Sequence, residues 1–212
     1  MVIKLKYLKD TVSNELIIEK SKFITSIYNV SSIEEVNEIL SSTRKKYYDA
    51  THNCYAYILG DNANIAKASD DGEPSKTAGF PILDVLKKND LTNVLCIVTR
   101  YFGGILLGAG GLVRAYSSST SEALKKGILL EKKYLNRLII KLDYSTYNSI
   151  INKLNGKIID QSFQSDIALT IAVSSEELEN TIDLINSASK AKAIITNDGL
   201  FEIFLPANIS KA

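Results

Sequence analysis

The stretch Val98–Ser117, "VTRYFGGILLGAGGLVRAYS", joins an apolar run to a helix-like segment and places five glycines within nine residues. A loop between a buried strand and a helix N-terminus is a place where free N–H groups and the helix dipole attract anions. The glycines are not followed by the Lys-Ser/Thr of a Walker loop, and the spacing G-x-G-x-x-G is absent. The stretch is therefore no nucleotide fingerprint, while a looser anion site stays open.

Two interpretations of the glycine-rich loop remain. Glycines permit positive-φ turns and close backbone approach. Alternatively the loop binds a ligand, because Arg100 and Arg114 stand on its two sides and two guanidinium groups can hold a phosphate or carboxylate. The two arginines could instead pair with the acidic loop that precedes them. The glycines concerned are Gly103, Gly104, Gly108, Gly110 and Gly111.

The acidic loop "SDDGEP" carries Asp70, Asp71 and Glu73 within four positions. Clustered carboxylates can hold Mg²⁺, but an Asp-Asp-Gly-Glu run is also common turn chemistry. Ion pairing that fixes this loop against the arginines is the favoured interpretation. We predict neither a metal site nor a cofactor.

His52 is the only histidine of the chain, and Cys54 follows two positions later. On a strand both side chains point to the same face, and a Cys–His pair can form a nucleophile when the thiol is exposed. Cys54 shares that face with Ala56 and Ile58, which indicates burial. We expect His52 to have a structural or ligand-contacting role, and no catalytic residue is assigned.

The 212 residues suit one large or two small domains, and two is the starting hypothesis. Lysines interrupt the apolar residues near the N-terminus, and no run reaches the roughly 18 apolar residues of a spanning helix. The two cysteines follow no metal or disulfide spacing. The N-terminal part is slightly basic and the remainder is slightly acidic. This charge asymmetry is too weak to indicate nucleic-acid binding by itself. We expect a soluble cytoplasmic protein without membrane contact.

The C-terminal third alternates between strand and helix periodicity. The order βαββαβ is the ferredoxin-like arrangement. The expected elements are strand 136–144, helix 147–154, strands 157–163 and 166–174, a helix capped by Ser174 and Glu177, and a β-rich segment 191–206 with a turn at Asp198-Gly199.

The N-terminal part is predicted as strands packed with helices, which makes the fold class α+β. Because the segment 93–102 is an almost continuous apolar run, we expect a strand covered on both faces. The boundary near Lys133 gives domains 1–133 and 134–212. The expected elements are strand 15–30, a helix 32–48 capped by Ser32 and Glu35, strands 52–60 and 63–71, a helix from Pro81 to Lys88, strand 93–102 and helix 110–127.

Three segments together resemble the IMPACT family, and in particular its bacterial YigZ-type members: "HNCYAYILG" at 52–60, "SDDGEPSKTAGFPILDVL" at 69–86, and the opening stretch 98–117. Two positions depart from the pattern. Lys76 stands where a glycine is usual, and Leu106 stands where a lysine or other polar residue is frequent. The matching residues are Asp70, Asp71, Gly72, Glu73, Pro74, Thr77, Ala78, Gly79 and Pro81, then residues 99–104, Gly108, Gly110, Gly111, Leu112, Arg114 and Tyr116.

The resemblance implies an N-terminal domain like domain two of ribosomal small-subunit protein five. It also implies a C-terminal ferredoxin-like domain similar to those of elongation factor G. In eukaryotes the family acts in translational control by binding the activator of a starvation-responsive kinase. By this resemblance, bacterial members lack the kinase pathway, so the resemblance implies a function in translation without identifying a partner.

We therefore expect a binding or regulatory protein, more consistent with a non-enzyme, that contacts the ribosome, RNA or a translation factor. The alternative is an enzyme acting on a small phosphorylated or carboxylated substrate, with His52 as acid or base. That alternative requires His52, Glu73 and Arg100 to meet in one pocket. The candidate contact residues are Arg100, Arg114, Tyr101, the five glycines, His52, Asp70, Asp71, Glu73 and Lys76. The sequence makes no prediction of the oligomeric state.

Overall fold

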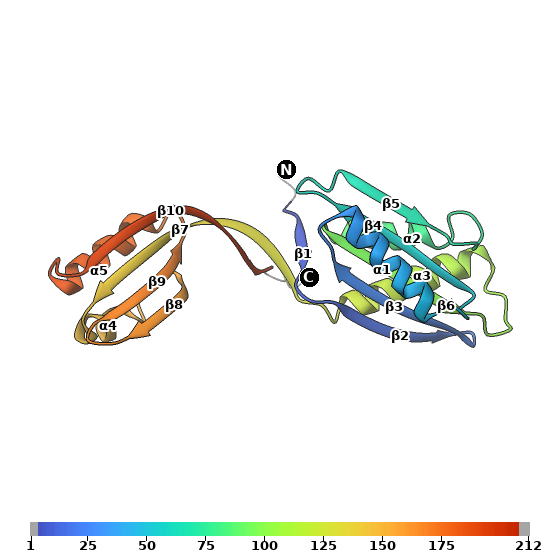
Figure 1. Cartoon of the computed structure of the whole chain (residues 1–212), viewed down its shortest axis with the longest axis horizontal. Coiled ribbons are helices and arrows are strands. Elements are labelled where there is room, and N and C mark those ends of the chain that lie inside the picture. The colour runs from blue at the N-terminus through green and yellow to red at the C-terminus, as the bar shows by residue number, and fades with distance from the viewer. Residues whose placement is uncertain (1–3, 208–212) are drawn as a thin grey trace. The chain divides into compact units, whose positions relative to one another are not determined.

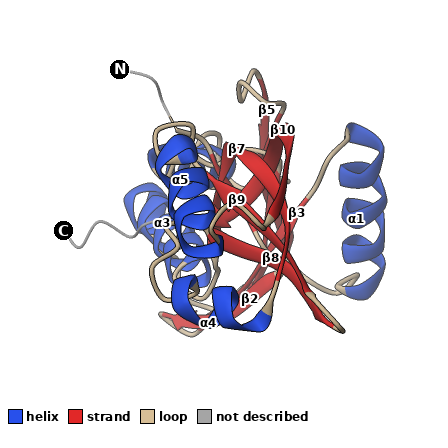
Figure 2. Ribbon diagram, turned by 90° about the vertical axis from the view of Figure 1, so that its left-hand side faces the viewer, coloured by secondary structure: helices blue, strands red, loops and turns tan. Residues whose placement is uncertain are grey.

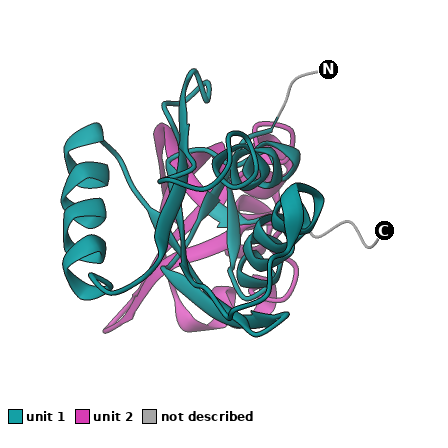
Figure 3. Ribbon diagram, turned by 90° about the vertical axis from the view of Figure 1, so that its right-hand side faces the viewer, with its two compact units in different colours: residues 1–131, 205–212 teal, residues 132–204 magenta. Residues whose placement is uncertain are grey.

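The computed structural model describes residues 4–207 and divides into two compact units. Figure 3 shows the first unit, which contains residues up to Glu131 and those from Leu205 onward, in teal, and the second, Lys132–Phe204, in magenta. Strand β7 (Leu129–Leu142) leads into the second unit and β10 (Ile194–Pro206) leads back. The Ala207 N–H donates to the Leu129 carbonyl at 2.8 Å, so the chain returns to the first unit.

The first unit is built on one antiparallel sheet in the order β2-β3-β6-β4-β5. Helix α1 (Ile33–Lys46) covers one face, and α2 (Gly79–Lys88) and α3 (Gly108–Leu124) cover the other (Figures 1 and 3). A short strand, β1 (Lys6–Leu8), pairs with the start of β7. The sheet strands are β2 (Val12–Ile18), β3 (Ser21–Asn29), β4 (His52–Leu59), β5 (Ile65–Ser69) and β6 (Val94–Tyr101).

Strand β6 lies at the centre of this sheet and is buried on both faces, as predicted. Cys96 and Val98 pack in the core under α2 and α3, whereas Leu95 and Ile97 pack in the core under α1. Because side chains alternate along a strand, Arg100 continues the set that faces α2 and α3.

The second unit has the predicted order βαββαβ. Its strands lie in the order β10-β7-β9-β8, and Figure 2 shows α4 and α5 on one face of that sheet. Leu138, Leu169 and Ile185 are fully buried between sheet and helices. The remaining elements are α4 (Tyr144–Ile150), β8 (Lys157–Phe163), β9 (Ile167–Val173) and α5 (Leu178–Ser189).

The single strand predicted over residues 15–30 is wrong, because β2 and β3 form a hairpin there. The chain reverses at Glu19 and Lys20, which have φ of 46° and 64°. A two-residue turn with both φ positive normally uses Asn-Gly or a similar pair. A Glu-Lys pair carries no such signal.

Several element bounds also differ from the expectation, and α5 begins at Leu178 with Glu177 as its N-cap residue instead of being capped by Ser174. Helix α2 begins at Gly79 instead of Pro81. Helix α4 begins at Tyr144, because the Asp143 carboxylate accepts the Thr146 N–H. No turn occurs at Asp198-Gly199, since β10 continues through it with Gly199 at a φ of 83°. The Ser32 cap of α1 is as predicted, with its side chain accepting the Glu35 N–H.

Candidate functional site

A row of three side chains crosses the first sheet beneath α3. Arg100 on β6 pairs in register with Phe23 on β3 and with His52 on β4. Paired residues on neighbouring strands project from the same face, which brings the three side chains together. The Arg100 guanidinium carbon lies 5.5 Å from the centre of the Phe23 ring and 5.6 Å from that of Phe102. The cation is thus held between two aromatic rings, an arrangement that favours it electrostatically.

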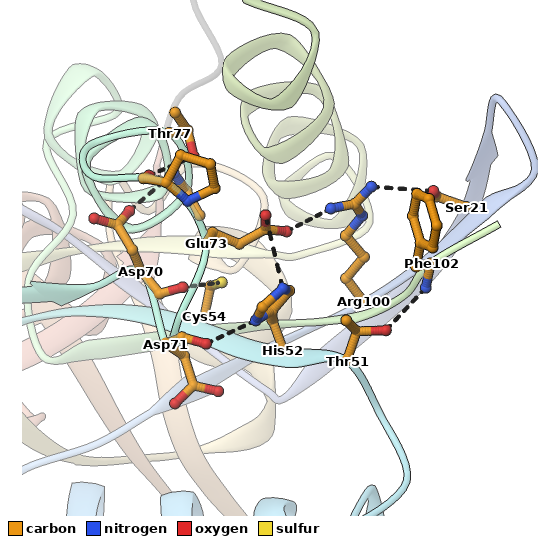
Figure 4. A network of polar contacts seen from close by, with 12 residues as sticks. Ser21, Thr51, His52, Cys54, Asp70, Asp71, Glu73, Thr77, Arg100 and Phe102 are labelled. Atoms are coloured by element: carbon orange, nitrogen blue, oxygen red, sulfur yellow. Dashed lines mark hydrogen bonds and ion pairs between the residues drawn. The ribbon is translucent and has the colours of Figure 1, made fainter. Parts of the chain in front are cut away.

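Glu73 from the acidic loop forms a buried ion pair with Arg100 (Figure 4). Arg100 Nη1 donates to Glu73 Oε1 at 2.7 Å, and the Tyr116 hydroxyl donates to the same oxygen at 2.7 Å. Burial raises the pKa of Tyr116, so its hydroxyl stays protonated and remains a donor. Arg100 and Glu73 are only 5% and 8% exposed. Their charges are therefore neutralised inside the protein.

The remaining donors of Arg100 are only partly used. Nη2 donates to the Ser21 hydroxyl at 3.2 Å, and Gly103 N–H donates to the same oxygen at 3.2 Å. Arg100 Nε is buried and has no hydrogen-bond partner within residues 4–207. Ser21 consequently ties the arginine to the start of the glycine-rich loop.

His52 is oriented by the acidic loop. Its Nδ1 lies 2.8 Å from the Asp71 carbonyl oxygen, which can only accept, so Nδ1 carries a proton. Its Nε2 faces Glu73 Oε2 at 3.8 Å, too far for a hydrogen bond. In the neutral ring Nε2 is therefore an acceptor for which residues 4–207 provide no donor, and it lies beside a carboxylate oxygen (Figure 4).

Asp70 holds the acidic loop against α2. Its carboxylate accepts the N–H groups of Lys76, Ala78 and Gly79 at 2.8 to 3.0 Å. Helix α2 has no cap from its own N-cap residue. Although Asp70 lies outside α2, its carboxylate therefore accepts hydrogen bonds from the free N–H groups at the start of that helix.

Asp71 is also occupied by contacts within the protein. Its Oδ2 accepts the Asn53 N–H at 2.7 Å, and its Oδ1 lies 3.4 Å from Arg44 Nη2. Among residues 4–207, no three His, Cys, Asp or Glu side chains are placed to hold a metal ion. Ion pairing and turn chemistry thus account for the acidic loop.

A cavity of about 380 Å³ opens over this row of side chains. His52, Glu73 and Arg100 all line it, so the geometric condition that the enzyme alternative requires is met. The first turn of α3 closes another side, and its N-cap residue Leu107 provides no side-chain hydrogen bond to that turn. The remaining lining residues are Thr51, Gly72, Pro74, Phe102, Leu106, Leu107, Gly108, Ala109 and Leu112.

With this geometry in view, the comparisons with known proteins identify the family. A model of the Impact N-terminal domain matches residues 19–124. A Haemophilus influenzae protein described as an IMPACT family member is 33% identical over 195 residues, which cover 88% of this chain and 93% of the relative. The chain belongs to the IMPACT family. This membership confirms what the three sequence segments indicated.

Other members of the IMPACT family are similarly close. YvyE of Bacillus subtilis is 47% identical over 146 residues, covering 69% of this chain and 67% of the relative. YigZ of Escherichia coli is 35% identical over 161 residues, covering 74% and 79%. A crystal structure of a hypothetical protein superposes with a TM-score of 0.59 at 29% identity, covering 92% of this chain and 97% of the other. The fold described here therefore has a solved counterpart.

Both departures from the IMPACT pattern have a structural explanation. Lys76 has a φ of 63°, a left-handed conformation that glycine adopts without strain, which accounts for the usual glycine. Its Nζ lies 5.9 Å from the centre of the exposed Phe80 ring. Leu106 is 88% exposed, so a polar residue suits the position equally well. Neither departure disturbs the Arg100–Glu73 ion pair.

Among the glycines of this IMPACT loop, Gly103 has the least room for a side chain. A Cβ atom at Gly103 would collide with the backbone of Lys20. Gly104 and Gly108 have positive φ, whereas Gly110 and Gly111 lie in α3 without it. Close packing and turn geometry thus shape the first half of the loop.

Arg114 and Tyr101 lie apart from Arg100. Arg114 is exposed and lines a second hollow of about 450 Å³, which shares Leu106 and Leu107 with the first but does not include Arg100. Arg114 makes no ion pair with the acidic loop within residues 4–207. Tyr101 projects to the α1 side, where its hydroxyl donates to Asp49 at 2.8 Å. The structure does not bring the two arginines to one ligand.

Cys54 does not form a nucleophile with His52. It is fully buried, and its thiol donates to the Asp70 carbonyl at 3.0 Å. Burial raises the pKa of Cys54 to about 12. The thiol therefore stays neutral and serves packing, as the sequence pattern indicated.

Sequence reasoning missed Phe23, Ser21 and the role of Tyr116 in binding Glu73. One signal was available, because an arginine at the end of a strand buried on both faces needs a buried partner. No local pattern showed that Glu73 would be that partner. No helix of residues 4–207 has both the length and the apolar character needed to cross a membrane.

Proposed function

We propose that this IMPACT family member is a non-enzymatic binding protein with a regulatory role in translation, and that the loop of residues 102–107 is its contact surface. The exposure of Leu106, at 88%, carries the proposal. Phe102 and Ile105 on the same loop are 45% and 37% exposed. Neighbouring apolar side chains left in water indicate a surface that a partner covers.

The chemistry of the loop favours a protein partner, such as a translation factor or a ribosomal protein, over RNA. RNA binding depends strongly on cations that meet phosphates. Arg100 is paired with Glu73, so Arg114 is the exposed cation among the residues that line the adjoining hollow. The family resemblance supports the link to translation and a cytoplasmic location. It also supports the likeness of the first domain to domain two of ribosomal small-subunit protein five and that of the second to the ferredoxin-like domains of elongation factor G.

The substitution Leu106→Lys tests the proposal and separates the two partner classes. A protein that buries Leu106 should be lost, because the lysine would place a charge in an apolar contact. An RNA partner should bind more tightly, with a steeper salt dependence. The measurement is quantitative mass spectrometry of proteins and RNA that co-purify with the chain from a cell lysate.

Tyr48→Ala is the matched control for this experiment, since Tyr48 is 85% exposed and lies just after α1, on the other side of the sheet. It should leave the co-purifying proteins unchanged. Retention of every protein by the Leu106→Lys variant would remove the loop from the contact surface. A gain of RNA would replace the protein partner with a nucleic acid.

A second candidate function is an enzyme acting on a small phosphorylated or carboxylated substrate. The convergence of His52, Glu73 and Arg100 on one cavity favours it. His52 Nε2 would act as acid or base, while Asp71 fixes the ring through Nδ1. A panel of phosphate esters and carboxylic acids tests this, and any true turnover should disappear in His52→Gln.

A further inference from the structure

We infer that the cavity lined by His52, Glu73 and Arg100 binds a small anion that carries a hydroxyl group, such as a hydroxy acid or a phosphorylated alcohol. The inference uses the cavity of the second candidate function but needs no turnover. Phe102, Leu106 and Leu107 belong both to this cavity and to the loop 102–107, but the inference does not require a partner docked on that loop. Binding without reaction would refute the enzyme and leave the ligand site standing.

The hydroxyl preference follows from two facing acceptors. Glu73 Oε2 makes no hydrogen bond within residues 4–207, although the Glu73 side chain is only 3% exposed. His52 Nε2 stands 3.8 Å away and, in the neutral ring, also only accepts. Two facing acceptors cannot bond to each other, so a donor for either one has to come from a third group. A ligand hydroxyl can donate to one and lie beside the other.

A protonated amine fits the same pair of acceptors less well. The Arg100–Glu73 pair is formally neutral, so it offers no net negative charge to balance an ammonium group. The first turn of α3 also places the positive end of a helix dipole at the cavity. A neutral hydroxyl avoids that repulsion.

The anion preference follows from the first turn of α3 and from Arg100. Leu107, Gly108 and Ala109 line the cavity, and Leu107 provides no side-chain cap for α3. The first N–H groups of an α-helix have no partner within the helix and accept anions readily. Arg100 adds a second observation, because this buried arginine lines the cavity and its two Nη atoms, each with two N–H groups, make only one hydrogen bond each within residues 4–207. These donors complement the acceptors on Glu73 and His52.

The size and walls of the cavity set the scale of the ligand. About 380 Å³ accommodates a molecule of several heavy atoms. Pro74, Phe102 and Leu112 supply an apolar side for its carbon skeleton. The same functional groups occur in hydroxy acids and phosphorylated alcohols, and the experiment separates these two sources.

His52 provides the measurement because it is the only histidine. In protein with ¹⁵N-labelled histidine, the ring nitrogens report directly on one site. At about pH 8, lactate and glycerol 3-phosphate should shift the Nε2 signal on titration. Propionate and propyl phosphate are matched probes without the hydroxyl. Each should bind about tenfold or more weakly than its hydroxylated counterpart.

Ala109→Phe is the variant that tests the location. Ala109 is exposed at the start of α3 and lines the cavity, so a large side chain there fills the cavity without removing a buried group. It should abolish the shift, whereas Ala109→Ser should retain it. If lactate alone or glycerol 3-phosphate alone shifts the signal, the anion is identified as carboxylate or phosphate. Equal shifts from probes with and without hydroxyl, no shift from any probe, or a shift that survives Ala109→Phe would overturn the inference.

Discussion

At the scale of the residue, the charge of Arg100 is used inside the protein rather than at its surface. Two aromatic rings, the Glu73 carboxylate and the Ser21 hydroxyl surround it. A buried ion pair gains little over an apolar pair, but loss of one partner leaves an uncompensated buried charge. Replacement of Arg100 therefore tests the fold before it tests any function.

Arg100→Met and Glu73→Gln should each destabilise the first unit by about 3–5 kcal/mol. The double variant should lose less than the sum, since neither charge is then left alone. Urea unfolding followed by the NMR signal of His52 measures the first unit specifically. Strict additivity would contradict the account of this pair.

Both cysteines should resist alkylation in the folded protein. Burial raises the pKa of Cys54 and of Cys96 to about 12, so at about pH 8 only about one thiol in ten thousand is ionised. Iodoacetamide followed by mass spectrometry should find neither labelled until the protein is denatured. Labelling of Cys54 at the rate of a free cysteine would show that its thiol is accessible.

The residues of the site were predicted better than their contacts. His52, Glu73 and Arg100 were named from the sequence because each is a charged or titratable residue in an unusual local setting. Their partners were not, since Glu73 and Arg100 are 27 positions apart and only the packing of a loop on α2 joins them. Arg114 was grouped with Arg100 on sequence proximity, which does not reveal that they line different hollows.

At the scale of the element, the link from β6 to α3 is tightly packed at Gly103, where it begins, and loosely packed at Gly110, where it enters α3. Gly103 packs on the backbone of Lys20 in the β2–β3 turn and bonds Ser21. Gly110 lies at the start of α3, where an added Cβ meets only the end of the Arg114 side chain. The two glycines therefore have different tolerances.

Gly103→Ala should lower the melting temperature of the first unit strongly, because the backbone of Lys20 has to move. Gly110→Ala should be neutral or stabilise by up to about 1 kcal/mol, since alanine favours a helix over glycine. Thermal melts of the two variants, with the His52 NMR signal as reporter, make the comparison. Equal tolerance at both positions would contradict the close packing of Gly103.

Asp143 begins α4 and should report on acid stability of the second unit. Hydrogen bonds from Thr146 lower the pKa of Asp143 below its ordinary value of 3.8. A depressed folded pKa contributes stability above 3.8 that is lost as the pH falls through the lower folded value. The Thr146 amide shift should titrate with a midpoint below 3.8, and Asp143→Ala should remove that titration. A midpoint at or above 3.8 would show that the cap is not formed.

Elements with strong local signals were predicted, and those without were not. Ser32 and the basic last turn fix α1 locally, and the apolar run fixes β6. The β2–β3 hairpin depends on a Glu-Lys turn that only the pairing of its strands stabilises. Strand β1 is three residues long and exists through its pairing with β7, which no nearby pattern reveals.

At the scale of the whole molecule, the second unit is inserted into the first. Residues 205–207 rejoin the first unit, where the Ala207 N–H donates to the Leu129 carbonyl. Both cut points, after Glu131 and before Leu205, lie two residues from that hydrogen bond. A linker of about six residues can therefore join them.

A chain in which Gly/Ser replaces residues 132–204 should keep the His52 spectrum of the full chain. A chain that ends at residue 131 should melt at a lower temperature, because it lacks the backbone pairing of Ala207. Comparison of the two melting temperatures isolates the contribution of the returning segment. Identical values would mean that this segment does not stabilise the first unit.

The returning segment also orders the events of biosynthesis. A chain emerges from the ribosome starting at its N-terminus, and domains commonly fold as they appear. Residues 205–207 are made only after all of Lys132–Phe204. The N-terminal unit, although synthesised first, thus gains its last backbone contact after the second unit has been translated.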